Sequence, residues 1–203
     1  MKRSLPCNIA IIPPKNISKR AISISRALAK KRTLFTLDGK NYFPHLTIYM
    51  TEFPVKNINV VKDLLKQALN SASSFKINSS GYRNDKSGFI DVNFKRNKSI
   101  THLQRKIITV LNPLREGLIR KSDKEKFKQL SKAEKRNLML CGYRSISSNY
   151  SPHLTLTRFK EFDKNAISGI KKYDFSFHVK EIGFFKSGKH GACRKLLAKF
   201  KLS

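Results

Sequence analysis

The sequence predicts an α+β domain of 203 residues in which two related lobes face each other. Short apolar strand segments alternate with amphipathic helical segments, and several strands come in hairpin-like pairs. The residues Pro-His-Leu-Thr occur twice, at 44–47 and 152–155, each time followed by an apolar residue. Hydrophobic residues make up 39% of the chain, which is enough for a packed core.

The first half of the chain begins with the apolar segment "CNIAII" (7–12), which predicts a strand ended by two prolines. A helix is expected at 16–31, where apolar residues recur on one face: Ile17, Ala21, Ile24 and Leu28. A second amphipathic helix is expected at 54–70. Further strands are expected at 33–37, 42–50, 73–82 and 87–96, with turns at 38–41 and 83–86.

The second half begins with a helix at 99–118, for which Ser99 is the expected N-terminal cap. The highly charged segment that follows has helical propensity but few core-facing residues. We interpret about 119–141 as an exposed helical insert, either a lid or a solvated surface without function. Strands are then expected at 150–159, 175–187 and 190–202, and a short helix at 163–173.

The two halves repeat the order strand, helix, strand, strand around one His-Leu-Thr. Ser74-Phe75 in the first half corresponds to Ser176-Phe177 in the second, and Gly81 corresponds to Gly183. A duplication of this kind predicts two lobes within one domain, 1–203. The lobes are expected at about 33–98 and about 150–203.

The charge of the chain is strongly one-sided, with 43 Lys and Arg against 13 Asp and Glu, a net charge of +30. A bias toward lysine in the whole proteome usually raises glutamate as well, and here the acids are scarce. The balance favours a polyanionic partner such as RNA or another oligonucleotide. A membrane surface fits less well, because the basic residues are spread along the chain rather than gathered on one amphipathic helix.

Cysteine usage and hydropathy indicate the compartment. The three cysteines, Cys7, Cys141 and Cys193, are odd in number and form no CxxC, which argues against a disulfide scaffold or a zinc ribbon. No apolar run approaches the roughly 20 residues of a membrane span. The basic N-terminus leads into a strand rather than a signal peptide. We expect a cytoplasmic monomer without a membrane partner.

The repeated motifs place polar side chains on one strand face, because alternate residues of a strand share a face. The expected polar faces carry His45, Thr47 and Tyr49, and His153, Thr155 and Thr157. The apolar residues between them are expected to pack inward. If the two lobes face each other, two imidazoles and two hydroxyls surround one pocket.

This set of groups suits in-line displacement at phosphorus, which needs a base for the attacking oxygen and an acid for the leaving oxygen. Two histidines with pKa values of about 6.5 can provide both near neutral pH. Threonine hydroxyls can hold the non-bridging oxygens, and Arg158 can offset the developing charge. The motifs hold too few nearby carboxylates for a magnesium or manganese site, so no metal or other cofactor is expected. The remaining histidines are interpreted as structural: His102, His178 and His190.

With these motifs the sequence resembles the two-histidine (2H) phosphoesterases, the superfamily of the 2′-5′ RNA ligase or LigT-like proteins and the RNA cyclic phosphodiesterases. The resemblance covers most of the chain and includes "NIAIIPP", "PHLTI", "PHLTL" and the insert-bearing stretch "LNPLREGL…NLMLCGY". It implies a bilobal, pseudo-symmetric α+β fold, in which two antiparallel sheets face a central cleft and helices lie outside.

The resemblance also implies a catalytic set of His45, Thr47, His153 and Thr155. By the same resemblance, His45 is the acid for the leaving 3′ oxygen and His153 is the base for water. The candidates for contact with the substrate are Arg158 and four aromatic residues: Tyr49, Tyr143, Tyr150 and Phe159.

The leading hypothesis is a metal-independent phosphodiesterase that opens 2′,3′-cyclic phosphates on RNA or cuts 2′-5′ linkages. Cyclic nucleotides and oligonucleotide second messengers are alternative substrates. A non-catalytic RNA-binding protein on the same fold is an alternative from another class, although a pure binder needs no acid–base pair. Any ligation would be the reverse of hydrolysis, because the sequence shows no P-loop or nucleotide-binding lysine motif.

Overall fold

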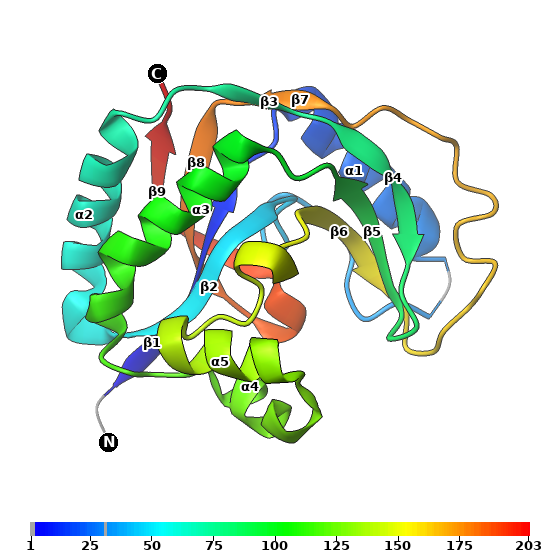
Figure 1. Ribbon diagram of the computed structural model, residues 1–203. Helices are drawn as coiled ribbons and strands as arrows, with labels where there is room; N and C mark the ends of the chain where they lie inside the picture. Colours follow the sequence, from blue (N-terminus) through cyan, green and yellow to red (C-terminus); the bar gives the residue numbers. More distant parts are fainter. Residues whose placement is uncertain (1–2, 31) are drawn as a thin grey trace.

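A computed structural model describes residues 3–30 and 32–203 (Figure 1). The strands are β1 (Ser4–Ile11), β2 (Leu46–Pro54), β3 (Phe75–Ile77), β4 (Ser79–Asn84), β5 (Phe89–Phe94), β6 (His153–Arg158), β7 (Phe177–Val179), β8 (Glu181–Ser187) and β9 (Cys193–Lys201). The α-helices are α1 (Lys15–Leu28), α2 (Ile58–Asn70), α3 (Lys98–Leu111), α4 (Lys121–Glu125) and α5 (Lys132–Cys141). The helix expected at 16–31 is α1, and the last residue of that range, Lys31, lies outside the described residues.

The strands form antiparallel sheets, which confirms the predicted α+β class. Seven strands make one sheet in the order β4-β5-β6-β2-β1-β8-β9, and β3 and β7 make a second, small sheet. The two motif strands, β2 and β6, are therefore neighbours at the centre of the large sheet. A single pair, Leu46 with Leu154, joins them. At this junction the sheet divides into two halves.

Side chains complete the hydrogen bonding of β2 at this junction. The Tyr150 hydroxyl donates to the carbonyl oxygen of Thr47 at 3.0 Å. The buried Gln104 amide donates to the carbonyl of Ile48 at 2.9 Å and to that of Ser145 at 3.1 Å. A buried carbonyl needs a donor, so these two side chains stand in for strand pairing where β2 and β6 part.

Helices pack on both halves of the sheet (Figure 1). Helix α1 packs against β6, while α2 and α3 lie side by side and contact β9 and β2, respectively. The apolar residues of the two motifs are completely buried between these layers, as expected: Leu46, Ile48, Leu154 and Leu156.

The strand pairing relates the repeated segments to each other. Segments β3 and β7 pair with Lys76 opposite His178, so corresponding positions meet, as Leu46 and Leu154 do in the large sheet. However, β4 and β5 pair on the side of β6, while β8 and β9 extend the β2 half. The pairing thus crosses the ranges 33–98 and 150–203. The division into lobes stays a prediction.

Three local predictions were wrong. The segment 33–37 is not a strand. Thr33 forms only an isolated bridge with Phe159, and farther along the Leu37 amide and the Phe35 carbonyl bond to side chains instead. The segment 163–173 forms successive turns rather than a helix. The side-chain amide of Asn84 donates a hydrogen bond to the carbonyl of Asp163 there. Helix α3 is capped by Asn97, whose side chain accepts from the amide of Ile100 at 2.9 Å, and not by Ser99.

The cysteines and helices of the structure can be compared with the expectations about disulfides and membrane spans. Cys7, Cys141 and Cys193 all have free thiols, and burial raises the pKa of Cys7 to about 12. Within the described ranges, the structure contains no helix with the length and apolar character needed to span a membrane.

Candidate active site

Both motif histidines line one pocket of about 590 Å³, which we call the histidine pocket. The structure places all four motif residues in its wall, although they come from β2, β6 and the residue before β2. Its lining includes His45, Thr47, Met50, Arg83, Asp91, Arg120, Ser122, Asp123, Lys126, Tyr143, Arg144, His153, Thr155, Arg158, Lys189 and His190.

The two histidines are held in the same way. His45 Nδ1 lies 2.8 Å from the carbonyl oxygen of Phe43, and His153 Nδ1 lies 2.8 Å from that of Ser151. Each partner is two residues earlier in the chain. A carbonyl only accepts, so Nδ1 carries the proton in both rings, and in the neutral form the acceptor lone pair of each ring is on Nε2.

Each motif contains a β-bulge directly after its threonine. The pairing of β1 with β2 leaves Ile48 as an extra residue, and the pairing of β5 with β6 leaves Leu156 as an extra residue. A bulge shifts the alternation of side chains beyond it by one position. As a result Met50 and Arg158 line the pocket, whereas simple alternation places them on the opposite face.

The bulges overturn the predicted orientation of Tyr49 and Thr157. Both residues are completely buried and neither lines the pocket. The Tyr49 hydroxyl donates to the carbonyl of Cys141 at 2.7 Å, and the Thr157 hydroxyl donates to that of Phe35 at 2.6 Å. In this position the Tyr49 ring cannot stack on a substrate base.

Of the other three aromatic candidates, one lines the histidine pocket and two do not. Tyr150 and Phe159 are buried outside the histidine pocket. Tyr150 instead supports Thr47 through its carbonyl. Tyr143 lines the pocket, with its ring edge-on to that of Tyr49 at 6.1 Å between centroids. Among the four predicted aromatics, only Tyr143 is placed to meet a ligand in this pocket.

The two threonine hydroxyls have different partners. Thr47 Oγ1 accepts from the amide of Asn8 on β1 at 2.9 Å. Thr155 Oγ1 donates to Asp91 Oδ1 on β5 at 2.7 Å. Because a carboxylate only accepts, the Thr155 hydroxyl proton is already used, whereas that of Thr47 remains available to a ligand. The second oxygen of Asp91 pairs with Arg83 at 2.6 Å.

Because His45 is buried, its pKa differs from that of an ordinary imidazole. Desolvation lowers the pKa of His45 from 6.5 to about 4, and the nearby charge of His153 lowers it further. Hydrogen bonds to the backbone of Phe43 and Gly191 oppose this effect. His45 is therefore neutral at pH 7 in the free protein.

The wall of the pocket is strongly cationic. Of its three acids, Asp91 pairs with Arg83, and Asp123 pairs with Arg120, whose Nε lies 2.7 Å from the carboxylate. The third, Asp85, accepts from the amide of Ser87, and despite burial the charges of Arg83 and Arg158 help to lower its pKa. Four further cations line the pocket and form no ion pair within the described residues: Lys126, Arg144, Arg158 and Lys189. This excess of positive charge favours an anionic ligand.

The helical insert contributes to this wall. Arg120 and Lys126 come from its first turns. The buried Arg115 anchors the two ends of the insert, donating to the carbonyls of Leu118 and Met139 at 2.8 Å each. The insert is thus one side of the histidine pocket rather than a wholly solvated surface.

A third histidine lines the pocket, contrary to its structural interpretation from the sequence. His190 has a positive φ of 60° beside Gly191, and its Nδ1 lies 3.0 Å from the guanidinium of Arg158. Burial and the nearby cations lower its pKa. The sequence signal that was missed is a histidine next to glycine in a turn, a place where loops approach ligands.

Two more residues of the site, Asn8 and Asp91, were missed by the sequence reasoning. Both are almost completely buried polar residues in otherwise apolar strand segments, "CNIAII" and "FIDVNF". A polar residue at a core position of a strand is the signal that could have found them, because such a residue needs a partner. Among the described residues no group of three or more His, Cys, Asp or Glu is placed to hold a metal ion.

Comparisons with known proteins bear on this arrangement. The sequence model of the 2′-5′ RNA ligase superfamily matches residues 13–191. No curated protein matches the chain significantly. Among solved structures, Escherichia coli LigT complexed with 3′-AMP is similar over 99% of both chains, with a TM-score of 0.57 and 14% identity. LigT complexed with phosphate (98% of both chains, TM-score 0.55, 15% identity) and TT0787 of Thermus thermophilus (98% of both, TM-score 0.58, 14% identity) are also similar.

Proposed function

The chain belongs to the 2′-5′ RNA ligase superfamily, and from that premise we propose that it is a metal-independent phosphodiesterase acting on RNA-type phosphates. The observation that supports this most is the matched pair of histidines. Both line one cationic pocket and both hold Nδ1 on a backbone carbonyl at 2.8 Å. Complexes of the similar LigT with phosphate and 3′-AMP agree with a phosphate ligand.

In the proposed reaction, water attacks phosphorus opposite the leaving ribose oxygen. One histidine takes the proton of the water as the new P–O bond forms. The other gives its proton to the ribose oxygen as the old P–O bond breaks. The free Thr47 hydroxyl donates to a non-bridging oxygen, and Arg158 offsets the added negative charge. Because the Thr155 hydroxyl donates its proton to Asp91, it can only accept a hydrogen bond from a ligand. This suits contact with the attacking water or with a ribose hydroxyl.

The lowered pKa of His45 supports an order of roles opposite to the one implied by the resemblance. A base must be neutral before the reaction starts, and His45 is neutral at pH 7 in the free protein. We therefore assign His45 as the base and His153 as the acid.

The test is turnover of a short RNA that ends in a 2′,3′-cyclic phosphate, with EDTA present. Wild type, His45→Ala and His153→Ala are compared, and the product is identified as a 2′- or 3′-monophosphate. We expect turnover that survives EDTA and falls in both variants by roughly 10²- to 10⁴-fold. Wild-type turnover neither of this RNA nor of a 2′-5′-linked oligonucleotide would contradict the proposal and favour an RNA-binding protein.

A further inference from the structure

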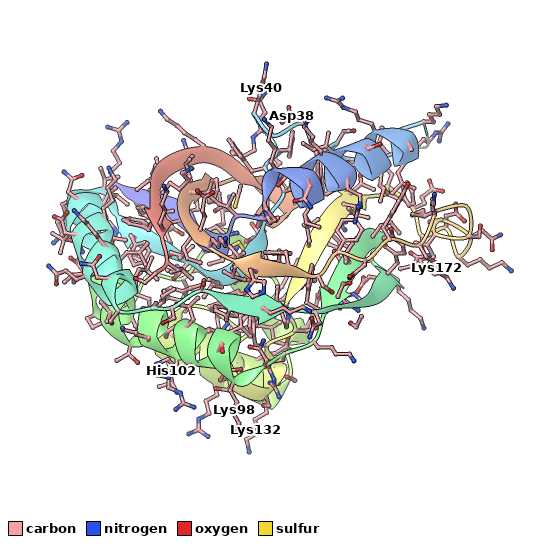
Figure 2. The ribbon with its side chains drawn as sticks, turned by 90° about the horizontal axis from the view of Figure 1, so that it is seen from above. Asp38, Lys40, Lys98, His102, Lys132 and Lys172 are labelled. Atoms are coloured by element: carbon pink, nitrogen blue, oxygen red, sulfur yellow. The ribbon has the colours of Figure 1, made fainter. Side chains whose placement is uncertain are left out.

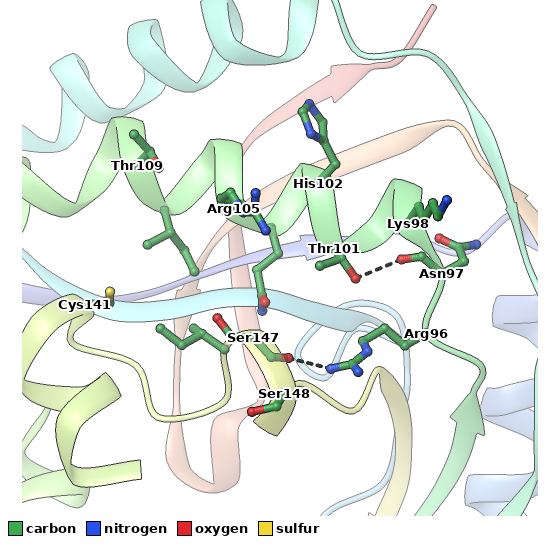
Figure 3. A pocket seen from close by; sticks show the side chains of 13 residues that line it. Arg96, Asn97, Lys98, Thr101, His102, Arg105, Thr109, Cys141, Ser147 and Ser148 are labelled. Atoms are coloured by element: carbon green, nitrogen blue, oxygen red, sulfur yellow. Dashed lines mark hydrogen bonds between the residues drawn. The ribbon is translucent and has the colours of Figure 1, made fainter. Parts of the chain in front are cut away.

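A second hollow of about 920 Å³ lies between α3 and residues 146–148 (Figure 3). We call it the α3 groove. The side chains that matter for its chemistry are Arg96, Lys98, Thr101, Arg105, Ser147 and Ser148.

The α3 groove has the chemistry of a phosphate-backbone site. Arg96, Lys98 and Arg105 are exposed cations, and none of the lining residues, all of which are described, is acidic. Hydroxyls of Thr101, Ser147 and other residues lie between the cations (Figure 3). Nucleic-acid backbones are bound by this combination of Lys, Arg and hydroxyl groups. Figure 2 shows Lys98 pointing outward from α3, away from the sheet.

The α3 groove and the histidine pocket share one wall. Ser145, Asn149 and Ser151 line the histidine pocket, while residues 146–148, in the same loop, line the groove. Arg96 holds this loop from the groove side by donating to the carbonyl of Ser147 at 2.6 Å. One stretch of chain, residues 145–151, therefore lines both hollows.

We propose that the α3 groove binds the phosphodiester backbone of a single-stranded RNA whose terminal phosphate lies in the histidine pocket. The proposal rests on the proposed function and extends it from the reacting group to the length of the substrate. It also gives a role to cations of α3 such as Lys98 and Arg105, which line the groove and not the histidine pocket.

The test compares two matched double variants. Lys98→Gln with Arg105→Gln removes two cations of the α3 groove. Lys19→Gln with Arg26→Gln is the control, since it removes a lysine and an arginine at the same spacing from α1. All four side chains are exposed, and both helices have 14 residues. Arg96 is left in place, because its loss would disturb the shared loop.

The first measurement is equilibrium binding of a single-stranded RNA of about 12 nucleotides with an ordinary 3′-hydroxyl end, over a range of salt concentrations. The groove variant is expected to bind roughly tenfold more weakly at about 0.1 M salt. Its slope of log K against log salt should be shallower by about 1.4, from two lost contacts of about 0.7 each. The control is expected to change affinity about twofold or less. Equal losses in both variants, or none in the groove variant, would overturn the proposal.

The second measurement separates this proposal from the proposed function. Substrates ending in a cyclic phosphate are compared as a dinucleotide and as the longer RNA. The groove variant should raise KM for the longer RNA alone and leave kcat on the dinucleotide unchanged. Wild type that binds the long RNA through the groove but turns over neither substrate refutes only the phosphodiesterase. Turnover of both substrates with identical KM in the groove and control variants refutes only the groove.

Discussion

The two His-Leu-Thr motifs have the same backbone and different neighbours. Both place Nδ1 of the histidine on the carbonyl two residues earlier, and both are followed by a one-residue bulge. They differ in the strand that pairs with them, because β1 supplies the amide of Asn8 and β5 supplies the carboxylate of Asp91. The repeated motif therefore fixes where the groups stand, and the unrepeated neighbouring strands fix which of them donates a proton.

The largest expected effect tests the division of labour between the two histidines. On a cyclic phosphate, alanine at either position should reduce kcat by roughly 10²- to 10⁴-fold. On a p-nitrophenyl diester of a nucleotide, the leaving group needs no proton. On this diester, the kcat of His153→Ala should be within roughly tenfold of wild type, while His45→Ala should stay inactive. Recovery of His45→Ala instead would restore the order implied by the resemblance.

The next effect compares the two threonines through the same isosteric change. Thr47→Val removes a donor to the phosphoryl oxygen and should lower kcat by about 10²-fold or more. Thr155→Val removes the partner of the buried Asp91, so its main effect should be a loss of about 1–3 kcal/mol in unfolding free energy. Steady-state kinetics and urea unfolding of both variants check the pattern. Equal kcat losses in both would show that the Asp91 bond gives no asymmetry.

The third effect follows from the lowered pKa of His45. Between pH 6.5 and about 4 the unfolded chain binds a proton at this residue and the folded protein does not, so acid favours unfolding. Stability should fall over this window by up to about 3 kcal/mol more in wild type than in His45→Gln. Urea unfolding at several pH values measures the difference. An NMR titration of His45 near 6.5 would contradict it, and added phosphate should raise the pKa toward that value.

The smallest effect concerns the junction between the motif strands. Tyr150→Phe removes the donor to the partly buried carbonyl of Thr47 and should cost about 1–2 kcal/mol of unfolding free energy. Tyr82→Phe is the control, because its hydroxyl donates to the exposed carbonyl of Lys171. We expect the control to lose less than half as much in urea unfolding. Equal losses would mean that the Tyr150 hydrogen bond stabilises the junction no more than an exposed one does.

The sequence predicted the parts of the site that local patterns control. The doubled motif was sufficient to find His45 and His153, and burial of the apolar residues between them confirms the strand alternation up to each threonine. Beyond the threonines the prediction failed for Tyr49, because the bulge arises from pairing with β1, which residue spacing alone does not encode. His190 was missed for a similar reason, since tertiary contacts bring its turn to the pocket.

The single pair at the centre of the sheet has a consequence for how such a protein can evolve. In a continuous ladder, neighbouring strands are locked about 4.8 Å apart by repeated backbone bonds. Between β2 and β6 that lock is reduced to Leu46 and Leu154, and the side chains of Tyr150 and Gln104 supply the remaining bonds. Substitutions of Tyr150 or Gln104 can therefore change the distance between the two imidazoles. A lineage can change the spacing of the two motif strands while both His-Leu-Thr sequences remain unchanged.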